Sequence, residues 1–157
     1  MSYLSEDMKV YVGGPMTGIP QFNYPAFDAA ATDLRDRGFT VVSPAELDDP
    51  EIRKEALASP DGIMGSGSVN GETWGDFLKR DVKLIADDVD GCAFMEGWER
   101  SRGARLEAFV AKLCKKPVAS YPTLEPIDDF ELLAAWASVL DLDVNNIPVY
   151  DYDLEQA

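Results

Sequence analysis

A glutamate, Glu107, interrupts the small apolar face of a helix that the sequence predicts for residues 103–113. Its neighbours three and four residues away are apolar: Ala104, Val110 and Ala111. The alanines leave room for a ligand, and the helix dipole favours an ionised carboxylate one turn after the start of the helix. An enclosed, ionised carboxylate is suited to nucleophilic attack on a sugar carbon. The alternative is a solvated glutamate on the edge of a helix.

A second carboxyl, Asp81, falls by its spacing inside the apolar stripe of a helix predicted for residues 74–87. The stripe consists of Trp74, Phe77, Leu78, Val82 and Ile85. Because the chain contains no histidine, proton transfer near neutral pH must use a carboxyl, Tyr, Lys or Cys, and imidazole metal ligands are excluded. Two inward carboxyls on successive helices suggest an acid and a nucleophile that their environments set apart. Ion pairing of Asp81 with Arg80 or Lys79 fits the spacing equally well.

The elements around the two carboxyls alternate between strands and helices. Apolar strands are predicted at residues 8–13, 39–42, 91–95 and 117–120, and helices at residues 25–37, 74–87 and 103–113. This alternation predicts an α/β fold, an open parallel sheet with helices on both faces. Ligands of such sheets bind beyond the carboxyl ends of the strands, so the loops 13–23 and 96–103 are candidate binding segments. We expect a long mobile loop with one helical turn at 48–71 and a last helix at 128–140.

The two candidate loops supply the residues that we expect to bind a substrate. They are Gly13, Gly14, Pro15, Met16 and Asn23 from the first loop, and Trp98, Ser101 and Gly103 from the second. Trp98, like Trp74, is a candidate for the core first and for a base-stacking wall second. The first loop lacks the G-x-G-x-x-G spacing of a dinucleotide fingerprint. We expect no cofactor and no metal ion.

Ser101 and Gly103 open the helix that carries Glu107. A hydroxyl, a glycine and exposed backbone amides at a helix N-terminus form a natural anion site. Three arginines surround these residues in an acidic chain: Arg100, Arg102 and Arg105. A phosphate site and a surface cluster that balances nearby acids explain these arginines equally well.

The chain of 157 residues carries a formal net charge of −15, which limits its partners. Its length suits one domain, and residues 121–157 contain nine acids and no Lys or Arg. Because an acidic surface repels phosphate backbones, we expect no nucleic-acid partner. No apolar run is long enough to span a membrane, and the N-terminus lacks the pattern of a signal peptide. Cys92 and Cys114 are expected to be buried free thiols, which favours the cytoplasm.

Several segments together resemble the phage-rich family called domain of unknown function 4406. They are residues 11–18, 23–27, 43–46, 79–81 and 97–107, and the resemblance covers about residues 8–120. This family is similar to the nucleoside 2-deoxyribosyltransferase superfamily. The resemblance implies a flavodoxin-like domain over residues 1–120 and leaves an acidic extension with one helix over 121–157. It also implies that Asp90, at the start of the third strand, is structural.

The resemblance further implies a covalent glycosyl-enzyme mechanism. Glu107 would attack C1′ of the sugar, Asp81 would protonate or hold the base, and Tyr11 would orient Glu107. Six residues before the nucleophile, relatives that act on free nucleosides have a carboxylate for the 5′-OH, and relatives that hydrolyse 5′-monophosphates have a serine. Ser101 occupies this position, and a hydroxyl binds a phosphate that a carboxylate would repel. The expected activity is cleavage of the N-glycosidic bond of a (deoxy)nucleoside 5′-monophosphate.

The acceptor of the sugar and the role of the acidic extension stay open. Either water or a second base can accept the sugar, and a transferase that uses free nucleosides is the nearest alternative activity. A non-catalytic phage protein that sequesters a nucleotide is a second alternative. The extension has a possible role in protein interaction, for example as a DNA mimic. Because relatives complete their pockets with a neighbouring subunit, we expect a homo-oligomer.

Overall fold

A four-stranded sheet forms the centre of the computed structural model, which describes residues 3–65 and 68–138. Its strands are β1 (Lys9–Gly13), β2 (Thr40–Val42), β5 (Gly91–Phe94) and β6 (Val118–Ser120). All neighbouring strands are parallel, in the order β2-β1-β5-β6, and Val10 pairs with both Val41 and Gly91. This is the order of flavodoxin-like sheets, in which the direction of the winding reverses between β1 and β5. The predicted open parallel sheet is confirmed.

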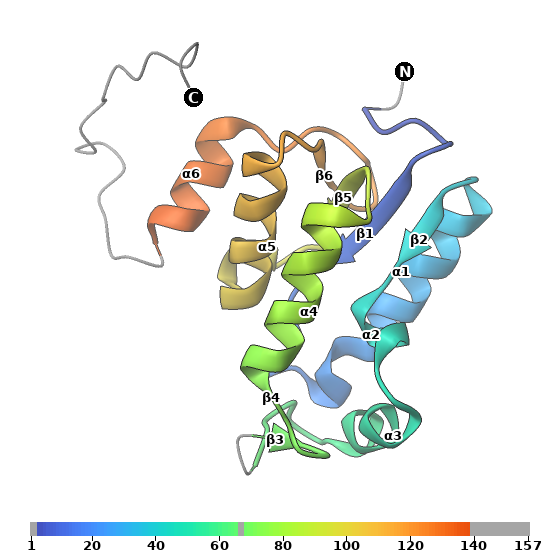
Figure 1. Ribbon diagram of the computed structural model, residues 1–157, viewed down its shortest axis with the longest axis vertical. Helices are drawn as coiled ribbons and strands as arrows, with labels where there is room; N and C mark the ends of the chain where they lie inside the picture. The colour runs from blue at the N-terminus through green and yellow to red at the C-terminus, as the bar shows by residue number, and fades with distance from the viewer. Residues whose placement is uncertain (1–2, 66–67, 139–157) are drawn as a thin grey trace.

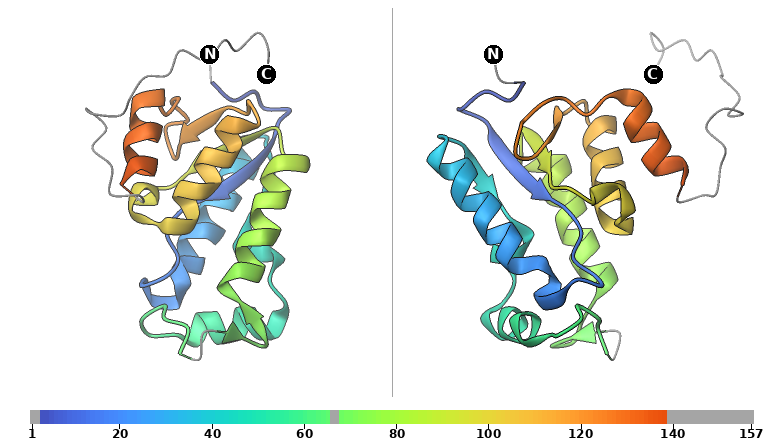
Figure 2. Two further views of the ribbon diagram at one scale, coloured as in Figure 1. Left: turned by 60° about the vertical axis from the view of Figure 1, so that its left-hand side comes forward. Right: turned by 180° about the vertical axis from the view of Figure 1, so that it is seen from behind.

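Helices cover both faces of the sheet, as Figures 1 and 2 show. α1 (Tyr24–Asp36) lies on one face, and α4 (Trp74–Asp87) and α5 (Arg102–Leu113) lie on the other. Alternate side chains of β1 serve the two faces: Val10 and Val12 join the core with α1, and Tyr11 joins the core with α4 and α5. α6 (Asp129–Ala137) packs on α5, where the rings of Phe109 and Trp136 stack at a centroid distance of 4.4 Å.

The two helices that carry Asp81 and Glu107 begin at side-chain caps. For α4, the Thr73 hydroxyl accepts from the Asp76 N–H at 3.3 Å, and the Asp76 carboxylate accepts from the Thr73 N–H at 2.9 Å. α5 begins at Ser101, whose hydroxyl oxygen accepts from the Ala104 N–H at 3.3 Å. The ammonium group of Lys116 donates to three carbonyls at the end of α4, those of Ile85, Ala86 and Val89. These contacts fix both ends of α4 and the start of α5.

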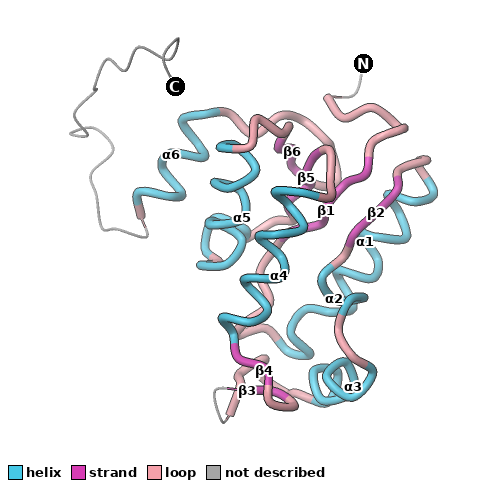
Figure 3. The backbone as a smooth tube through the Cα atoms, in the orientation of Figure 1, coloured by secondary structure: helices cyan, strands magenta, loops and turns pink. Residues whose placement is uncertain are grey.

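The segment after β2 differs from the prediction (Figure 3). The short helix α2 (Pro44–Leu47) is followed by the nine-residue helix α3 (Pro50–Ala58) and by a hairpin of β3 (Ser68–Val69) and β4 (Glu72–Thr73). The expected loop with a single helical turn is therefore wrong. Asp49 caps α3 by accepting from the Glu51 N–H at 2.9 Å, and Ile52 and Ala56 bury its inner side. The Gly, Ser and Pro residues that follow α3 obscured this pattern in the sequence.

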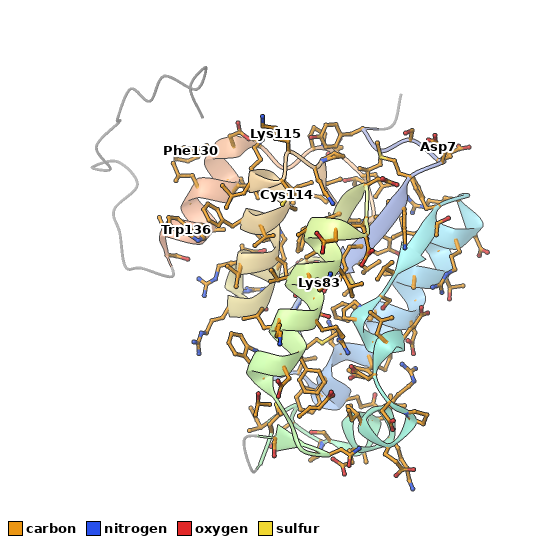
Figure 4. All side chains as sticks on the ribbon, viewed as in Figure 1. Asp7, Lys83, Cys114, Lys115, Phe130 and Trp136 are labelled. Atoms are coloured by element: carbon orange, nitrogen blue, oxygen red, sulfur yellow. The ribbon has the colours of Figure 1, made fainter. Side chains whose placement is uncertain are left out.

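The remaining elements lie close to their predicted positions, and α4 has the predicted bounds. Lys9 N–H donates to Asp90 at 2.8 Å and ties the start of β1 to the start of β5, which fits the structural role expected for Asp90. Cys92 is buried, but Cys114 is exposed because it follows the last residue of α5 (Figure 4), so its expected burial is wrong. The rest of the predicted extension, residues 139–157, lies outside the described residues. Within the described residues, no helix is long and apolar enough to cross a membrane.

Candidate active site

A cavity of about 1290 Å³ lies at the carboxyl ends of β1 and β5. The loops that follow these two strands line it together with α4, the start of α5, and α3. This is the point where the winding of the sheet reverses, the usual binding place in sheets of this kind. The volume exceeds the roughly 300–1,000 Å³ of most small-molecule sites. The cavity is therefore the candidate site for a substrate.

Asp81 on α4 and Glu107 on α5 both line this cavity, and each is only 7% exposed. Burial, and after it the nearby charge of Asp81, raise the pKa of Glu107 to about 8. The carboxyl groups of two neighbouring helices thus influence each other electrostatically. Desolvation thus opposes the helix dipole, which favours the ionised form of Glu107. Burial therefore favours the protonated form of Glu107 in the free protein.

The Asp81 side chain is buried at the cavity and is also paired with Arg80, so the inward carboxyl and the ion pair that its spacing allowed are both present. Burial raises the pKa of Asp81, and the guanidinium of Arg80, which donates from Nε at 2.8 Å, opposes this rise. Arg80 also donates from Nη1 to Asp48 at 2.5 Å, and the Tyr24 hydroxyl donates to the other oxygen of Asp48. Tyr24 of α1, Asp48 between α2 and α3, and Arg80 of α4 thus form a network that holds Asp81 in place.

Tyr11, from the middle of β1, lies behind the two carboxyls. Its side chain is fully buried, and burial together with the charges of Glu107 and Asp81 raises the pKa of its hydroxyl well above the ordinary value. The hydroxyl interacts with both carboxyls and lowers the pKa of each, but it meets neither at the distance and angle of a full hydrogen bond. A neutral, buried hydroxyl beside two carboxyls is placed to orient either of them.

The start of α5 forms another wall of the cavity. The Ser101 oxygen accepts the capping bond from Ala104, which leaves its O–H to donate toward the cavity. Ser101 and Gly103 line the cavity together with Arg100 and Arg102, and the guanidinium of Arg102 lies 5.3 Å from the centre of the Trp74 ring. First-turn amides of a helix have no acceptor within the helix and favour an anion. This wall is chemically suited to a phosphate group.

The model of a family described as Domain of unknown function (DUF4406) matches residues 8–120. The chain belongs to this family. The DUF4406 match includes all four strands of the central sheet and both buried carboxyls, whereas α6 lies beyond it. No curated protein and no solved structure matches the chain.

Within this DUF4406 domain, most of the predicted site residues line one cavity. They are Gly14, Pro15, Met16, Asn23, Asp81, Ser101, Gly103 and Glu107. Asn23 also shapes the loop, because its amide donates to the Pro15 carbonyl at 2.9 Å. Of the three arginines, Arg100 and Arg102 line the cavity, whereas Arg105 donates to Ser138 of the segment after α6 at 2.6 Å.

Two predicted binding residues, Gly13 and Trp98, lie outside the cavity wall. A Cβ at Gly13 would stand 2.3 Å from the Phe94 ring, so this glycine serves the close approach of β1 and β5. Trp98 is 4% exposed and packs on Phe94 at a centroid distance of 5.7 Å. The core interpretation of Trp98 is therefore the correct one, whereas Trp74 is 41% exposed and lines the cavity.

The sequence analysis missed Asp48 and Tyr24 as parts of the site. Asp48 lies 33 positions before Asp81, and no spacing rule connects them; only the fold brings Arg80 between them. Arg80 itself was visible as a partner of Asp81, because the two are adjacent. Within the described residues, no group of three or more His, Cys, Asp or Glu side chains is arranged to hold a metal ion.

Proposed function

We propose that the chain cleaves the N-glycosidic bond of a (deoxy)nucleoside 5′-monophosphate through a covalent glycosyl intermediate on Glu107. The observation that carries the proposal is the pair of buried, interacting carboxyls, Glu107 and Asp81, on one cavity at the reversal point of the sheet. A carboxyl with a strongly perturbed pKa in a cleft is typical of acid–base and nucleophilic sites. The resemblance to nucleoside 2-deoxyribosyltransferases supplies the reaction class.

One proton on the carboxyl pair is sufficient for the first step. A Glu107 oxygen forms a bond to C1′ while the bond between C1′ and the base breaks, and its electron pair goes to the base nitrogen. The proton that the pair held passes through Asp81 to the departing base. Glu107 is then an ester, Asp81 is an ionised carboxylate beside Arg80, and the base leaves neutral. With one proton, the carboxyl pair thus holds the proton that the first step transfers to the base.

In the second step an acceptor attacks C1′ and releases Glu107. With water as acceptor, the oxygen bonds to C1′, the ester bond breaks, and the proton of the water returns to the carboxyl pair. With a second base as acceptor, its nitrogen takes the place of the water oxygen and its proton returns in the same way. Two inversions at C1′ give overall retention of configuration. Tyr11 acts as a positioning residue, since its hydroxyl interacts with both carboxyls.

The start of α5 is the proposed site of the 5′-phosphate. Ser101 can donate its hydroxyl, the helix N-terminus favours an anion, and Arg102 adds positive charge. Charge-assisted hydrogen bonds are worth roughly 1.5–3 kcal/mol each, so loss of one contact costs about tenfold to a hundredfold in affinity. We therefore propose that monophosphates are processed at least ten times better than the matching nucleosides.

The test is a chromatographic assay for free base, with matched nucleosides and 5′-monophosphates, each with and without an acceptor base. We expect base release from monophosphates, none from the Glu107→Ala variant, and a trapped sugar adduct on Glu107 in the unaltered protein. Ser101→Asp should reverse the preference, because a carboxylate repels the phosphate and accepts from a 5′-OH. Near-normal turnover by Glu107→Ala would contradict the mechanism, and a preference for free nucleosides would contradict the substrate class.

A non-catalytic role has one observation in its favour. A protonated Glu107 is a poor nucleophile, and burial favours that form in the free protein. A phage protein in the host cytoplasm that sequesters a nucleotide would need the cavity and the phosphate wall but no ionised carboxylate. Tight binding of a monophosphate without any release of base would establish this role instead.

A further inference from the structure

One end of the cavity is closed by an end cap, which we define as η1 (Pro20–Asn23) and α3 with the segments 18–19 and 59–64. These segments lie together at the end of the molecule opposite to α6 (Figure 1). Three hydrogen bonds join them: Gly18 N–H to Gly62 O at 3.0 Å, Gln21 N–H to Ser59 O at 2.8 Å, and Gln21 Nε2 to Leu57 O at 3.2 Å. The end cap is therefore a built wall.

Two backbone features show how closely the end cap is assembled. A Cβ at Gly62, which has φ +68°, would lie 2.0 Å from the Ile19 carbonyl oxygen, so only glycine permits this approach. Three successive residues, Gln21, Phe22 and Asn23, adopt left-handed φ values of 59°, 49° and 62°. Such a run is costly for residues with side chains, and it reverses the chain where Phe22 lines the cavity.

The end cap turns an apolar surface toward the cavity. Six of the lining residues that it contributes are apolar: Ile19, Phe22, Ile52, Ala56, Ile63 and Met64. The seventh is Asn23, whose amide donates to the Pro15 carbonyl. Ile63 remains 54% exposed, which is a large apolar surface that the chain itself leaves uncovered. The wall at the start of α5 that we propose for the phosphate, by contrast, has the Ser101 hydroxyl, backbone amides, and the arginines Arg100 and Arg102. One cavity thus joins a polar wall to an apolar wall.

Successive turns of α4 connect Asp81 to the end cap. Phe77 and Leu78 lie one turn before Asp81, and Trp74 lies two turns before it, about 10 Å along the helix axis. All three line the cavity, and β4 joins Trp74 directly to the segment after the end cap. A base held at Asp81 that extends along α4 toward the end cap therefore lies beside the three apolar side chains of Phe77, Leu78 and Trp74.

We propose that the preferred substrate is a nucleoside 5′-monophosphate whose base carries an apolar substituent, and that the end cap and the first turns of α4 bind this substituent. The inference rests on the proposed function, because that function sets the sugar at Glu107 and the base at Asp81. An unmodified base would leave the apolar wall in contact with water. The cavity of about 1290 Å³ has room for the additional group.

The test compares two pairs of probes: deoxyadenosine 5′-monophosphate with its N6-propyl derivative, and deoxyuridine 5′-monophosphate with its 5-propyl derivative. Each buried methylene improves binding roughly fourfold, so a propyl group should raise kcat/KM about tenfold to sixtyfold in at least one pair. Binding of the same probes to the Glu107→Gln variant is measured by calorimetry, which needs no turnover. No gain from the propyl group in either pair, by rate and by binding, would overturn the inference.

Two substitutions locate the effect. Ile63→Ser should remove most of the propyl advantage, because Ile63 is an exposed side chain of the end cap. Leu113→Ser is the matched control: Leu113 is 66% exposed at the end of α5, away from the cavity, and its loss should leave the advantage intact. An equal effect of both substitutions would also overturn the inference. Tighter binding of propyl probes without base release would support the apolar subsite and contradict the proposed reaction.

Discussion

At Glu107, two opposing effects on the carboxyl can be weighed by their magnitudes. A helix dipole contributes about 0.3–1 kcal/mol to an ionised group near the helix N-terminus. One pKa unit corresponds to about 1.4 kcal/mol, and burial with the charge of Asp81 brings the pKa of Glu107 to about 8 from an ordinary 4.5. The apolar neighbours that single out Glu107 in the sequence are the same groups that desolvate it. The sequence therefore predicted the position of this carboxyl but not its protonation state.

The proton on Glu107 should make the stability of the protein fall as the pH rises. The folded protein binds this proton more tightly than the unfolded chain does, so its contribution is complete below pH 4.5 and is lost as the pH rises through about 8. Glu107→Gln keeps the shape of the side chain without titrating. Urea unfolding should show this variant nearly as stable as the unaltered protein at pH 5 and roughly 2–5 kcal/mol more stable at pH 9.

The control for this prediction is Glu99→Gln, because the Glu99 side chain is 47% exposed. This substitution should leave the pH dependence of unfolding unchanged. A difference in stability between Glu107→Gln and the unaltered protein that stays constant from pH 5 to pH 9 would mean that Glu107 does not titrate in this range.

The titration of the carboxyl pair also leads us to expect a particular pH dependence of the proposed reaction. Above pH 8 the carboxyl pair loses the proton that must reach the departing base, so kcat/KM should fall about tenfold for each further pH unit. At acid pH the pair gains a second proton, Glu107 has no ionised form available, and the rate should fall again. Initial rates of base release between pH 5 and pH 10 measure both limbs. A rate that is flat across pH 7–10 would exclude the shared proton as the source.

Asp81 has a narrower role that its substitution can isolate. Asp81→Asn removes the route of the proton but leaves Glu107 able to attack, and it also removes the charge that raises the pKa of Glu107. We expect a large loss of kcat with bases that leave poorly and a small loss with activated bases that leave as stable anions. Rates across a series of leaving bases provide the measurement. Equal losses across the series would assign Asp81 a structural role only.

At the scale of the elements, sequence patterns predicted α4 correctly and failed to predict α3. α4 has a capping box and an amphipathic pattern over 14 residues, so its bounds follow from the sequence. α3 has nine residues, with two buried positions, and precedes a run of Gly, Ser and Pro. Its stability comes from the end cap that it joins. Short elements held by tertiary contacts show no clear hydrophobic periodicity in the sequence. The sequence analysis missed the apolar wall of the cavity for the same reason.

The network around Asp81 shows a second limit of the sequence. Its members come from α1, the segment before α3, and α4, which are far apart in the sequence and meet only in the folded protein. Asp48 has a side chain only 4% exposed, and it accepts from both Arg80 and Tyr24. Removal of either partner would leave a buried carboxylate without a full set of donors. Spacing along the chain carries no information on such contacts.

Gly62 should be essential for the end cap. Gly62→Ala places a methyl group 2.0 Å from the Ile19 carbonyl at a positive φ, whereas Gly71→Ala, also at positive φ (+82°), meets nothing within 4 Å. Both variants incur the backbone strain of about 1–2 kcal/mol, and only Gly62→Ala adds the clash. Limited proteolysis should therefore cut Gly62→Ala faster within residues 57–65 than it cuts Gly71→Ala. Equal cleavage of the two variants would show that the end cap tolerates the added group.

At the scale of the whole molecule, the proposed substrate is an anion that approaches an acidic protein. The chain carries a net charge of −15, and the cavity concentrates Arg80, Arg100 and Arg102 on its walls. Arg80 is engaged by Asp48 and Asp81, whereas Arg102 and Arg100, which lies 4.0 Å from Glu99, are the cations available to the proposed phosphate. Their field extends over roughly a Debye length of about 8 Å at physiological ionic strength. The proposed binding of a phosphate would therefore rely on short-range contacts at the start of α5 and not on long-range attraction.

Exposed apolar residues on α6 are the feature of the whole molecule that bears on its assembly. Phe130 (Figure 4) is 64% exposed on α6, and Leu133 of the same helix is 40% exposed. α6 has apolar residues on all sides, which is typical of a helix covered on more than one face. We expect a second copy of the chain to cover this surface, in line with the homo-oligomer that the resemblance implies.

Sedimentation should give a mass of at least twice the 17.2 kDa of one chain. Because each copy carries a charge of −15, association should strengthen as added salt screens the repulsion, from about 0.01 M to about 0.15 M ionic strength. Phe130→Glu should shift the mass toward 17.2 kDa, whereas Lys83→Glu, an exposed change on α4, should alter it little. A mass of 17.2 kDa at all concentrations, with full release of base, would show that one chain forms a complete site by itself.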